Sequence, residues 1–126
     1  SIANNTIYSP KLVKLTYLLV KKLPKEETYA LSDQMRRAAI SIPSNIAEGM
    51  GRSSHKEQTH FLEIAFGSLT ETMCQIEIAK DLKYITESDL KSTENLAYEI
   101  GRLLSGLRNR RLKLSKGEQG GKATGE

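Results

Sequence analysis

The sequence has little of several residue types, and each shortage excludes a class of protein. One cysteine in 126 residues cannot form an intrachain disulfide, and with two histidines it does not supply the ligands of a structural zinc site. Tryptophan is absent, and five tyrosines and two phenylalanines are too few for base recognition by stacking. The apolar run at residues 17–20 is far shorter than the roughly 18 residues of a membrane span, and the N-terminus lacks a signal-peptide pattern. We expect a cytoplasmic protein with no membrane partner.

Charge is nearly balanced in total but is divided along the chain. The sequence holds 19 lysines and arginines against 15 acidic residues. Residues 1–56 contain nine basic and four acidic side chains (+5), residues 57–101 contain three and nine (−6), and residues 102–126 contain seven and two (+5). This pattern indicates polyanion binding, or packing between oppositely charged helices, more than catalysis.

Apolar residues recur at three- and four-residue steps, and the alternation that is typical of strands is missing. Four such segments follow one another. The first ends at Pro24, the second begins near residues 26–28, the third begins near Ser54 and the fourth follows residues 86–89. Short connections between amphipathic helices predict an all-α fold, an antiparallel up-and-down four-helix bundle over residues 1–114. Residues 115–126 are rich in glycine and lysine, and we expect them to form a disordered tail.

The second segment has two apolar faces. Its core stripe consists of Leu31, Met35, Ala38, Ile42 and Ile46. Ile40 and Ala47 lie almost opposite this stripe at 100° per residue. A monomeric bundle has little use for a second apolar face, so Ile40 and Ala47 are predicted to lie in an oligomer interface.

The same segment contains residues that disturb a helix. Pro43 should kink it and free the carbonyl near Ala39, and Asn45 is placed to satisfy such a freed group. Gly49 and Gly51 should then end the helix, because glycine readily adopts the left-handed conformation that follows many helices.

A search for catalytic, cofactor-binding or metal-binding residues finds none. His55 and His60 would point about 140° apart on a helix, so they cannot share one metal ion. Cys74 has neither histidine within one helical turn, and we predict a small buried side chain there. The glycines at positions 49 and 51 follow no strand and precede no Gly-Lys-Ser/Thr sequence, which argues against a nucleotide P-loop. We expect neither an enzyme nor a cofactor.

Basic residues are the strongest candidates for a binding site, and they concentrate at the end of the fourth segment. No acidic residue lies between Glu99 and Glu118, whereas this region contains Arg102, Arg108, Arg110, Arg111 and Lys113. Two or three cations would be enough to complement the helix dipole. The excess predicts contact with a polyanion, mainly through phosphates, so that binding would be salt-sensitive and only weakly sequence-specific.

Two further pairs of basic residues are weaker candidates. Arg52 and Lys56 lie near the predicted start of the third helix, whose backbone amides could hold one phosphate with them. Arg36 and Arg37 lie on the polar side of the second helix. An ion pair between Arg37 and Glu48 explains that position as well as phosphate contact does.

The chain also resembles one known family over roughly residues 8–112. The matching segments are Pro24-Lys25-Glu26-Glu27, Tyr29-Ala30-Leu31, Gln34-Met35-Arg36-Arg37-Ala38-Ala39, Ser41-Ile42-Pro43-Ser44-Asn45-Ile46-Ala47-Glu48-Gly49, Gly51-Arg52, Phe61-Leu62, Ile64-Ala65 and Gly67-Ser68-Leu69-Thr70-Glu71. The sequence resembles the four-helix-bundle proteins encoded in intervening sequences of bacterial 23S ribosomal RNA genes. That family includes relatives of the accessory protein of diversity-generating retroelements.

The resemblance implies a homo-oligomer, pentameric and barrel-like, with a basic surface. It implies nucleic acid and a reverse transcriptase as partners in the retroelement branch, and it carries over no catalytic residues. Our leading prediction is a non-enzymatic oligomer that binds RNA or DNA backbone. The alternatives are a protein-interaction scaffold for a reverse transcriptase, and a structural oligomer without a nucleic-acid role.

Overall fold

The computed structural model describes the backbone of residues 2–124 and the side chains of residues 9–117. The elements in order are α1 (Ile2–Val20), a 3₁₀ turn η1 (Lys25–Glu27), α2 (Leu31–Met50), α3 (His55–Asp81) and α4 (Glu87–Thr124). No strand occurs between residues 2 and 124. The predicted all-α class with four helices is therefore confirmed.

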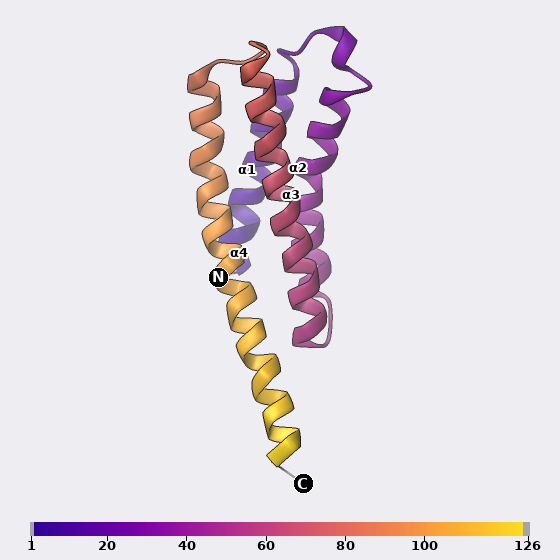
Figure 1. Ribbon diagram of the computed structural model, residues 1–126, viewed down its shortest axis with the longest axis vertical. Coiled ribbons are helices and arrows are strands. Elements are labelled where there is room, and N and C mark those ends of the chain that lie inside the picture. Colours follow the sequence, from indigo (N-terminus) through magenta and orange to yellow (C-terminus); the bar gives the residue numbers. More distant parts are fainter. Residues whose placement is uncertain (1, 125–126) are drawn as a thin grey trace.

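The four helices lie side by side as a bundle (Figure 1). Helix α1 packs against α2 and α4, and α3 packs against the same two helices. The α1–α2 and α3–α4 connections lie at one end, which we call the upper end, and the α2–α3 connection lies at the opposite, lower end (Figure 1). Helix α4 continues below the α2–α3 connection, so its last turns project from the bundle.

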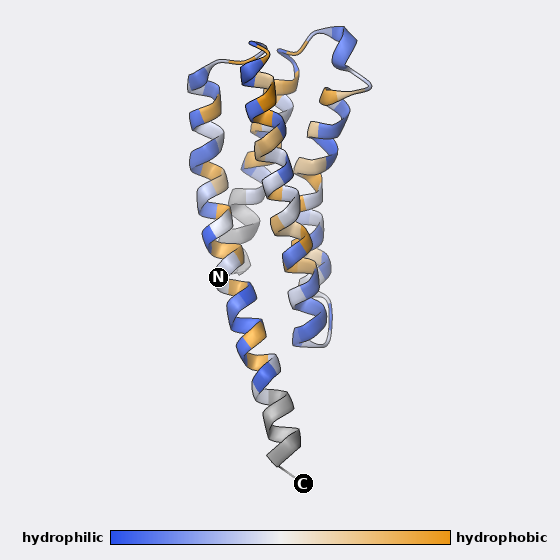
Figure 2. Ribbon diagram, in the orientation of Figure 1, coloured by the Kyte–Doolittle hydropathy of each residue, from blue (hydrophilic) through white to orange (hydrophobic). Residues whose placement is uncertain are grey.

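The core follows the predicted apolar stripes in two clusters. The lower cluster contains Leu12, Ile42, Ile46, Leu62, Ala65, Leu69, Ala97, Ile100 and Leu104. The upper cluster contains Leu19, Val20, Met35, Ile76, Ala79, Ile85 and Leu90. The helices carry apolar residues along the bundle, and the α2–α3 connection is hydrophilic (Figure 2). Burial of these faces provides most of the free energy that holds the helices together.

Side-chain caps begin α3 and α4, near the starts that the sequence predicts for these helices. The Glu57 N–H donates to Ser54 Oγ at 3.1 Å, at the start of α3. At the start of α4, the Thr86 N–H donates to Asp89 Oδ2 and the Asp89 N–H donates to Thr86 Oγ1, each at 3.0 Å. These bonds satisfy amide groups that have no partner inside a helix.

Helix α3 ends in a left-handed residue that is not glycine. Lys83 has a φ of 65°, and the Tyr84 N–H donates to the Ala79 carbonyl at 2.9 Å. This pattern is a Schellman motif, in which the left-handed position is usually glycine because a Cβ is strained there.

Helix α2 begins at Leu31, so the predicted start near residues 26–28 is wrong. Residues 25–27 form η1 instead, and the backbone of Ala30 lies outside the helical region (φ −124°, ψ −105°). The Tyr84 hydroxyl donates to Glu27 Oε2 at 3.3 Å, which ties η1 to the α3–α4 connection. This contact joins residues that are 57 positions apart in the sequence, and it helps to hold η1 as a separate turn before α2 begins.

The prediction that Gly49 and Gly51 end α2 is confirmed for Gly51 and wrong for Gly49. Helix α2 continues to Met50, and Gly51 is its cap residue, with a φ of −85° and not the left-handed conformation. A methyl group at position 49 would lie 3.0 Å from Phe61 Cβ and 3.3 Å from the Gln58 carbonyl oxygen. Glycine is favoured here because the first turns of α3 approach the α2 backbone closely.

The polar groups beside Pro43 are arranged differently from the prediction. Asn45 Nδ2 donates to the Ser41 carbonyl at 2.8 Å and to Ser41 Oγ at 2.9 Å, not to the carbonyl near Ala39. Ser41 Oγ lies 2.8 Å from Ser68 Oγ of α3. Small polar side chains thus join α2 and α3 beside the proline.

Two other expectations differ from the structure. Cys74 is exposed on α3, because it lies on the face directed away from both α2 and α4, and the prediction of a buried side chain is wrong. Residues 115–124 are helical, so residue 114, the expected boundary of the bundle, is not a change of secondary structure. No proline follows Leu114 to stop the helix, although the glycines there lower helix propensity.

Candidate nucleic-acid interface

Four of the nine basic candidates lie beside carboxylates. Arg37 Nε lies 3.1 Å from Asp33 Oδ2, and Arg36 lies 4.0 Å from the same carboxylate, near the start of α2. Arg102 lies 3.7 Å from Glu99. These pairs are exposed and only weakly stabilising, but they offset the positive charge that a phosphate would meet.

Arg52 is paired as well. Its guanidinium hydrogen-bonds to Glu48. The sequence analysis paired Glu48 with Arg37, but in the structure Glu48 forms its ion pair with Arg52. The Arg52 guanidinium also lies 4.8 Å from the centre of the Phe61 ring, within the range of a cation–π contact. Arg52, in the α2–α3 connection, is therefore held between the end of α2 and the first turns of α3.

The other five candidates gather at the lower end. Lys56 lies on the first turn of α3, and Arg108, Arg110, Arg111 and Lys113 lie on α4. None of these five makes an ion pair within the part of the chain whose side chains are described. We call the surface formed by these five residues and Arg52 the basic end.

Gln58 connects the two helices of the basic end. Its Nε2 donates to the Arg52 carbonyl at 2.9 Å, and its Oε1 accepts from Arg111 Nε at 3.3 Å. His55 Nδ1 lies 3.3 Å from the same oxygen. One amide side chain therefore fixes the α2–α3 connection to α4, across 53 residues of sequence. Nothing in the sequence marks Gln58 for this role.

Arg108 and Arg111 pack against the bundle, whereas Arg110 and Lys113 point to solvent. Arg108 lies 5.9 Å from the centre of the Phe66 ring, and its buried Nε has no hydrogen-bond partner. Arg111 also directs a guanidinium nitrogen to Met50 Sδ at 4.0 Å. Arg110 and Lys113 are exposed. The basic end thus has two ordered arginines and two free cations on one helix.

The weaker pair Arg36 and Arg37 is not part of this surface. Sixteen residues separate Arg36 from Arg52 along α2 and its end, which corresponds to about 24 Å at 1.5 Å per residue. The structure therefore brings together the α4 cluster with Arg52 and Lys56, and leaves Arg36 and Arg37 toward the other end. Arg102 lies on α4 about 13 Å from Arg111 by the same measure.

The clearest pKa shifts concern groups at the upper end. The Thr86 backbone N–H bond and the Lys22 ammonium, 2.9 Å away, lower the pKa of Asp89. Burial and the nearby Glu27 carboxylate raise the pKa of Tyr84. Both groups take part in helix capping or turn contacts, so their titration concerns stability.

Neither a metal site nor a membrane span is found in the described part of the chain. No three His, Cys, Asp or Glu side chains with described positions converge as metal ligands. Among the same residues, no helix combines the length and the apolar character that a membrane crossing requires.

Comparison with known proteins identifies the family. A crystal structure of a protein of unknown function from the S23 ribosomal protein family of Bacteroides thetaiotaomicron matches with a TM-score of 0.71 and 26% sequence identity, covering 86% of this chain and 98% of that chain. No curated protein sequence matches the chain. The family profile of the 23S rRNA-intervening sequence protein matches residues 8–106. This chain therefore belongs to the family of 23S rRNA-intervening sequence proteins.

Proposed function

We propose that this protein binds the phosphate backbone of RNA or DNA through the basic end, as a non-enzymatic assembly of several copies of an antiparallel up-and-down bundle. The observation that carries the proposal is the hydrogen bond between Gln58 and Arg111. It places Arg111 of α4 beside the α2–α3 connection and the first turn of α3, which carries Lys56. Arg110 and Lys113 lie about 100° and 160° away from Arg111 around α4, so the positive surface continues around this helix, where a phosphate backbone that wraps the lower end would meet several cations.

The chemistry of the basic end favours phosphates over bases. Arginine guanidinium groups bind phosphate oxygens in a bidentate manner, and Arg108 and Arg111 are already ordered by packing and hydrogen bonds. The two phenylalanines near this end, Phe61 and Phe66, lie beneath arginines, where their faces are not free for stacking on bases. The family description refers to 23S rRNA, so a structured RNA is the first ligand to test.

Self-assembly is part of the proposal. Ile40 is 43% exposed and Ala47 is exposed, so both predicted interface residues are accessible for contact with another copy. Several copies would present several basic ends, and linked weak contacts give an avidity that no single copy reaches.

The direct test is a fluorescence-anisotropy titration of labelled RNA and DNA duplexes at low and moderate salt. We expect binding at micromolar protein that weakens steeply with salt. Changing Arg110→Ala together with Lys113→Ala should lower the affinity and reduce the salt slope by about one per lost phosphate contact. Both side chains are exposed, so the fold should not change.

The matched control is Arg36→Ala with Arg37→Ala, which removes the same charge from the start of α2. This control should bind almost as the unchanged protein does. Absence of binding at low salt, or binding that is indifferent to salt, would contradict the proposal. A larger loss in the control than in the α4 variant would move the site away from the basic end.

A scaffold for a reverse transcriptase is the second candidate function. The exposed apolar side chains Ile40 and Ala47 favour it, since they suit a protein partner as well as another copy. Gene neighbourhood separates the candidates: an adjacent reverse-transcriptase gene with template and variable repeats favours the scaffold, and a position inside a ribosomal RNA gene favours the leading proposal.

A further inference from the structure

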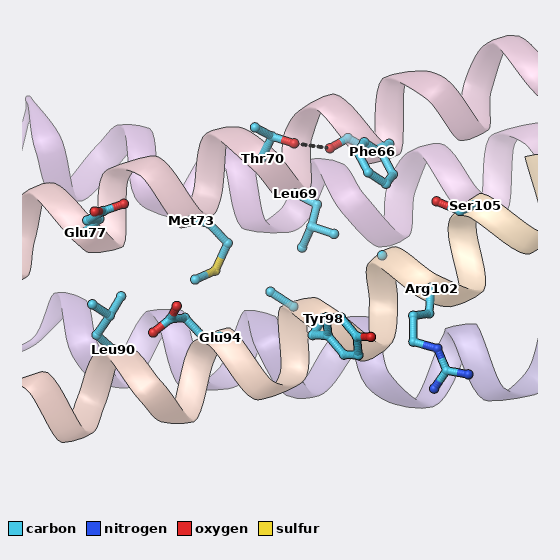
Figure 3. Close-up of a pocket in the computed structure, with 12 residues that line it drawn as sticks. Phe66, Leu69, Thr70, Met73, Glu77, Leu90, Glu94, Tyr98, Arg102 and Ser105 are labelled. Carbon is cyan, nitrogen blue, oxygen red and sulfur yellow. Dashed lines mark hydrogen bonds between the residues drawn. The ribbon is translucent and has the colours of Figure 1, made fainter.

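An open groove of about 740 Å³ lies between α3 and α4, above the basic end. Its floor is apolar and is formed mainly by Phe66, Leu69, Met73 and Ala97. Figure 3 shows Met73 and Leu69 directed from α3 toward α4, with Tyr98 on the opposite side of the groove. An apolar concave site of this size with a few polar groups at its edge is typical of sites for small organic molecules.

Two carboxylates stand at one end of the groove. Glu77 of α3 and Glu94 of α4 lie level with each other on opposite walls, and Arg102 lies toward the other end (Figure 3). Neither Glu77 nor Glu94 forms an ion pair with a described side chain. Arg102, in contrast, lies 3.7 Å from the Glu99 carboxylate, which offsets its charge. The groove therefore favours a ligand with positive charge at the end where the two glutamates stand.

The arrangement of these carboxylates suits one cationic group between them. Packed helices lie about 8–10 Å apart, and both glutamate side chains are exposed, so each can turn toward a cation in the space between the walls. An ammonium group has three N–H donors and can bind both carboxylates at once. Calcium and magnesium ions need about six oxygen ligands, and no third acidic side chain with a described position joins this pair. The apolar floor beside the carboxylates also favours an organic cation.

The width of the groove favours a small molecule over a protein helix. Its α3 wall runs from Phe66 to Glu77, which is about 16 Å at 1.5 Å per residue. The volume of about 740 Å³ then corresponds to a mean cross-section of about 45 Å². An α-helix with its side chains is about 10–12 Å across and needs about twice that cross-section. A single alkyl or aryl chain fits within it.

Tyr98 and Gly101 shape the wall that α4 contributes. Tyr98 follows Glu94 by one helical turn and is 68% exposed, so its ring stands beside the apolar floor where it can cover a ligand. A Cβ at Gly101 would lie 3.6 Å from Leu69 Cδ2 and 4.0 Å from the Phe66 ring. A larger side chain at position 101 would therefore occupy the floor that a ligand needs.

We propose that the α3–α4 groove binds a small organic cation, with one protonated amine between Glu77 and Glu94 and an apolar body that lies along the floor toward Phe66. Tyr98 covers the apolar body from the α4 side. The groove is separate from the basic end, which attracts anions. It is also separate from Ile40 and Ala47 of α2, because α2 and α4 do not pack against each other within the described residues.

The test uses the full chain, phenylbutylamine as the probe and methyl NMR of the methionines, without nucleic acid. Of the three methionines, Met73 lies on the groove floor, whereas Met50 lies at the end of α2 beside Arg111. Titration should shift the Met73 methyl signal in a saturable way and leave the Met50 signal in place. We expect a dissociation constant of about 1 mM or tighter for a ligand of this size.

Two probes of the same length separate charge recognition from apolar binding. Phenylbutanol lacks the charge and phenylbutyrate reverses it, so both should bind at least about fivefold more weakly than the amine. Added salt should weaken binding of the amine and leave binding of the alcohol nearly unchanged, since salt screens only the charged contact.

A matched pair of variants tests the two carboxylates. Glu77→Gln with Glu94→Gln keeps the size of both side chains, and it should weaken amine binding at least about fivefold and leave phenylbutanol binding unchanged. Glu63→Gln with Glu71→Gln removes the same charge from α3 positions outside the groove, and this control should bind the amine as the unchanged protein does.

A second pair of variants tests the floor. Gly101→Leu should weaken binding of both the amine and the alcohol at least tenfold, because the new side chain occupies their place. Gly106→Leu, five residues further along α4 with no atom within 4 Å of its Cβ position, is the control and should bind both probes normally. Circular dichroism checks that all variants remain helical.

Several results would overturn the inference. They are equal affinity for the amine and the alcohol, an unchanged amine affinity in Glu77→Gln with Glu94→Gln, or a Met50 shift as large as that of Met73. Absence of a Met73 shift at about 5 mM amine would have the same meaning. If a lysine-containing helical peptide shifted Met73 where the amine did not, the groove would belong to a protein partner instead. The polyanion proposal is tested separately, because these titrations contain no nucleic acid.

Discussion

Substituting Gly49→Ala tests the close approach of α2 and α3 that supports the basic end. The new methyl group would lie 3.0 Å from Phe61 Cβ and 3.3 Å from the Gln58 carbonyl oxygen. Neither atom is the end of a flexible side chain, since one is a Cβ and the other is backbone. The first turns of α3 would have to move by a few tenths of an ångström, together with Gln58.

Two opposing effects set the magnitude. Overpacking of a well-packed contact costs about 2 kcal/mol, and replacing glycine by alanine inside a helix contributes about 1 kcal/mol in favour of folding. We expect a net loss of about 1 kcal/mol, which corresponds to a decrease in Tm of about 4 °C for a chain of this length.

The control is Gly67→Ala on α3, where no atom lies within 4 Å of the new Cβ. That change should stabilise the protein by up to about 1 kcal/mol, because only helix propensity acts. Urea unfolding followed by circular dichroism at 222 nm, at one protein concentration, measures both variants. A Gly49→Ala variant as stable as Gly67→Ala would refute the close approach.

Three further substitutions and one labelling experiment test other parts of the structure. Lys83→Gly should raise the free energy of unfolding by about 0.5–1 kcal/mol, because glycine relieves the left-handed strain, and the urea midpoint measures this. Asp89→Ala should lower it by about 1 kcal/mol at neutral pH, since the α4 cap is lost. The pKa of Asp89 is lowered in the folded protein, so its ionised carboxylate stabilises the fold fully above its unfolded pKa, and this stabilisation is lost as the pH falls through its folded pKa. Thermal melts between pH 6 and pH 2 should therefore show the Tm of the variant approaching that of the unchanged protein as the pH falls. Ser54→Ala should cost about 1 kcal/mol in the same urea assay. A thiol reagent should label Cys74 completely in the folded protein, and slow labelling would contradict its exposure.

The helices and their cores could be predicted because they depend on local sequence. Periodic apolar residues such as Leu12, Ile42 and Leu62 are buried as expected, and the caps at Ser54 and Thr86 form with their own neighbours. A pattern of period 3.6 and a cap four residues long are both visible in a linear sequence.

The details that depend on contacts between distant residues could not be predicted. Gly49 was interpreted as a helix stop because a sequence does not show that another helix passes 3.0 Å away. The bond from Arg111 to Gln58 spans 53 residues, and the pairing of Arg52 with Glu48 depends on α2 continuing to Met50. Charge alone identified the basic cluster, but only the fold shows which of its members are already paired.

Under the proposed function, the projecting segment of α4 would affect how quickly a polyanion is captured. From Arg111, where α4 touches Gln58, the helix continues for 13 residues to Thr124, about 20 Å at 1.5 Å per residue. That reach is about twice the Debye length at 0.1 M salt. A nucleic acid that meets the far end of this segment is therefore screened from the acidic residues of α3, whereas Lys113 and Lys116, about 3 Å and 8 Å beyond Arg111, lie within one Debye length of the bundle and add to the field of the basic end. An exposed helix also accepts approach from many directions, so encounter would require little prior orientation.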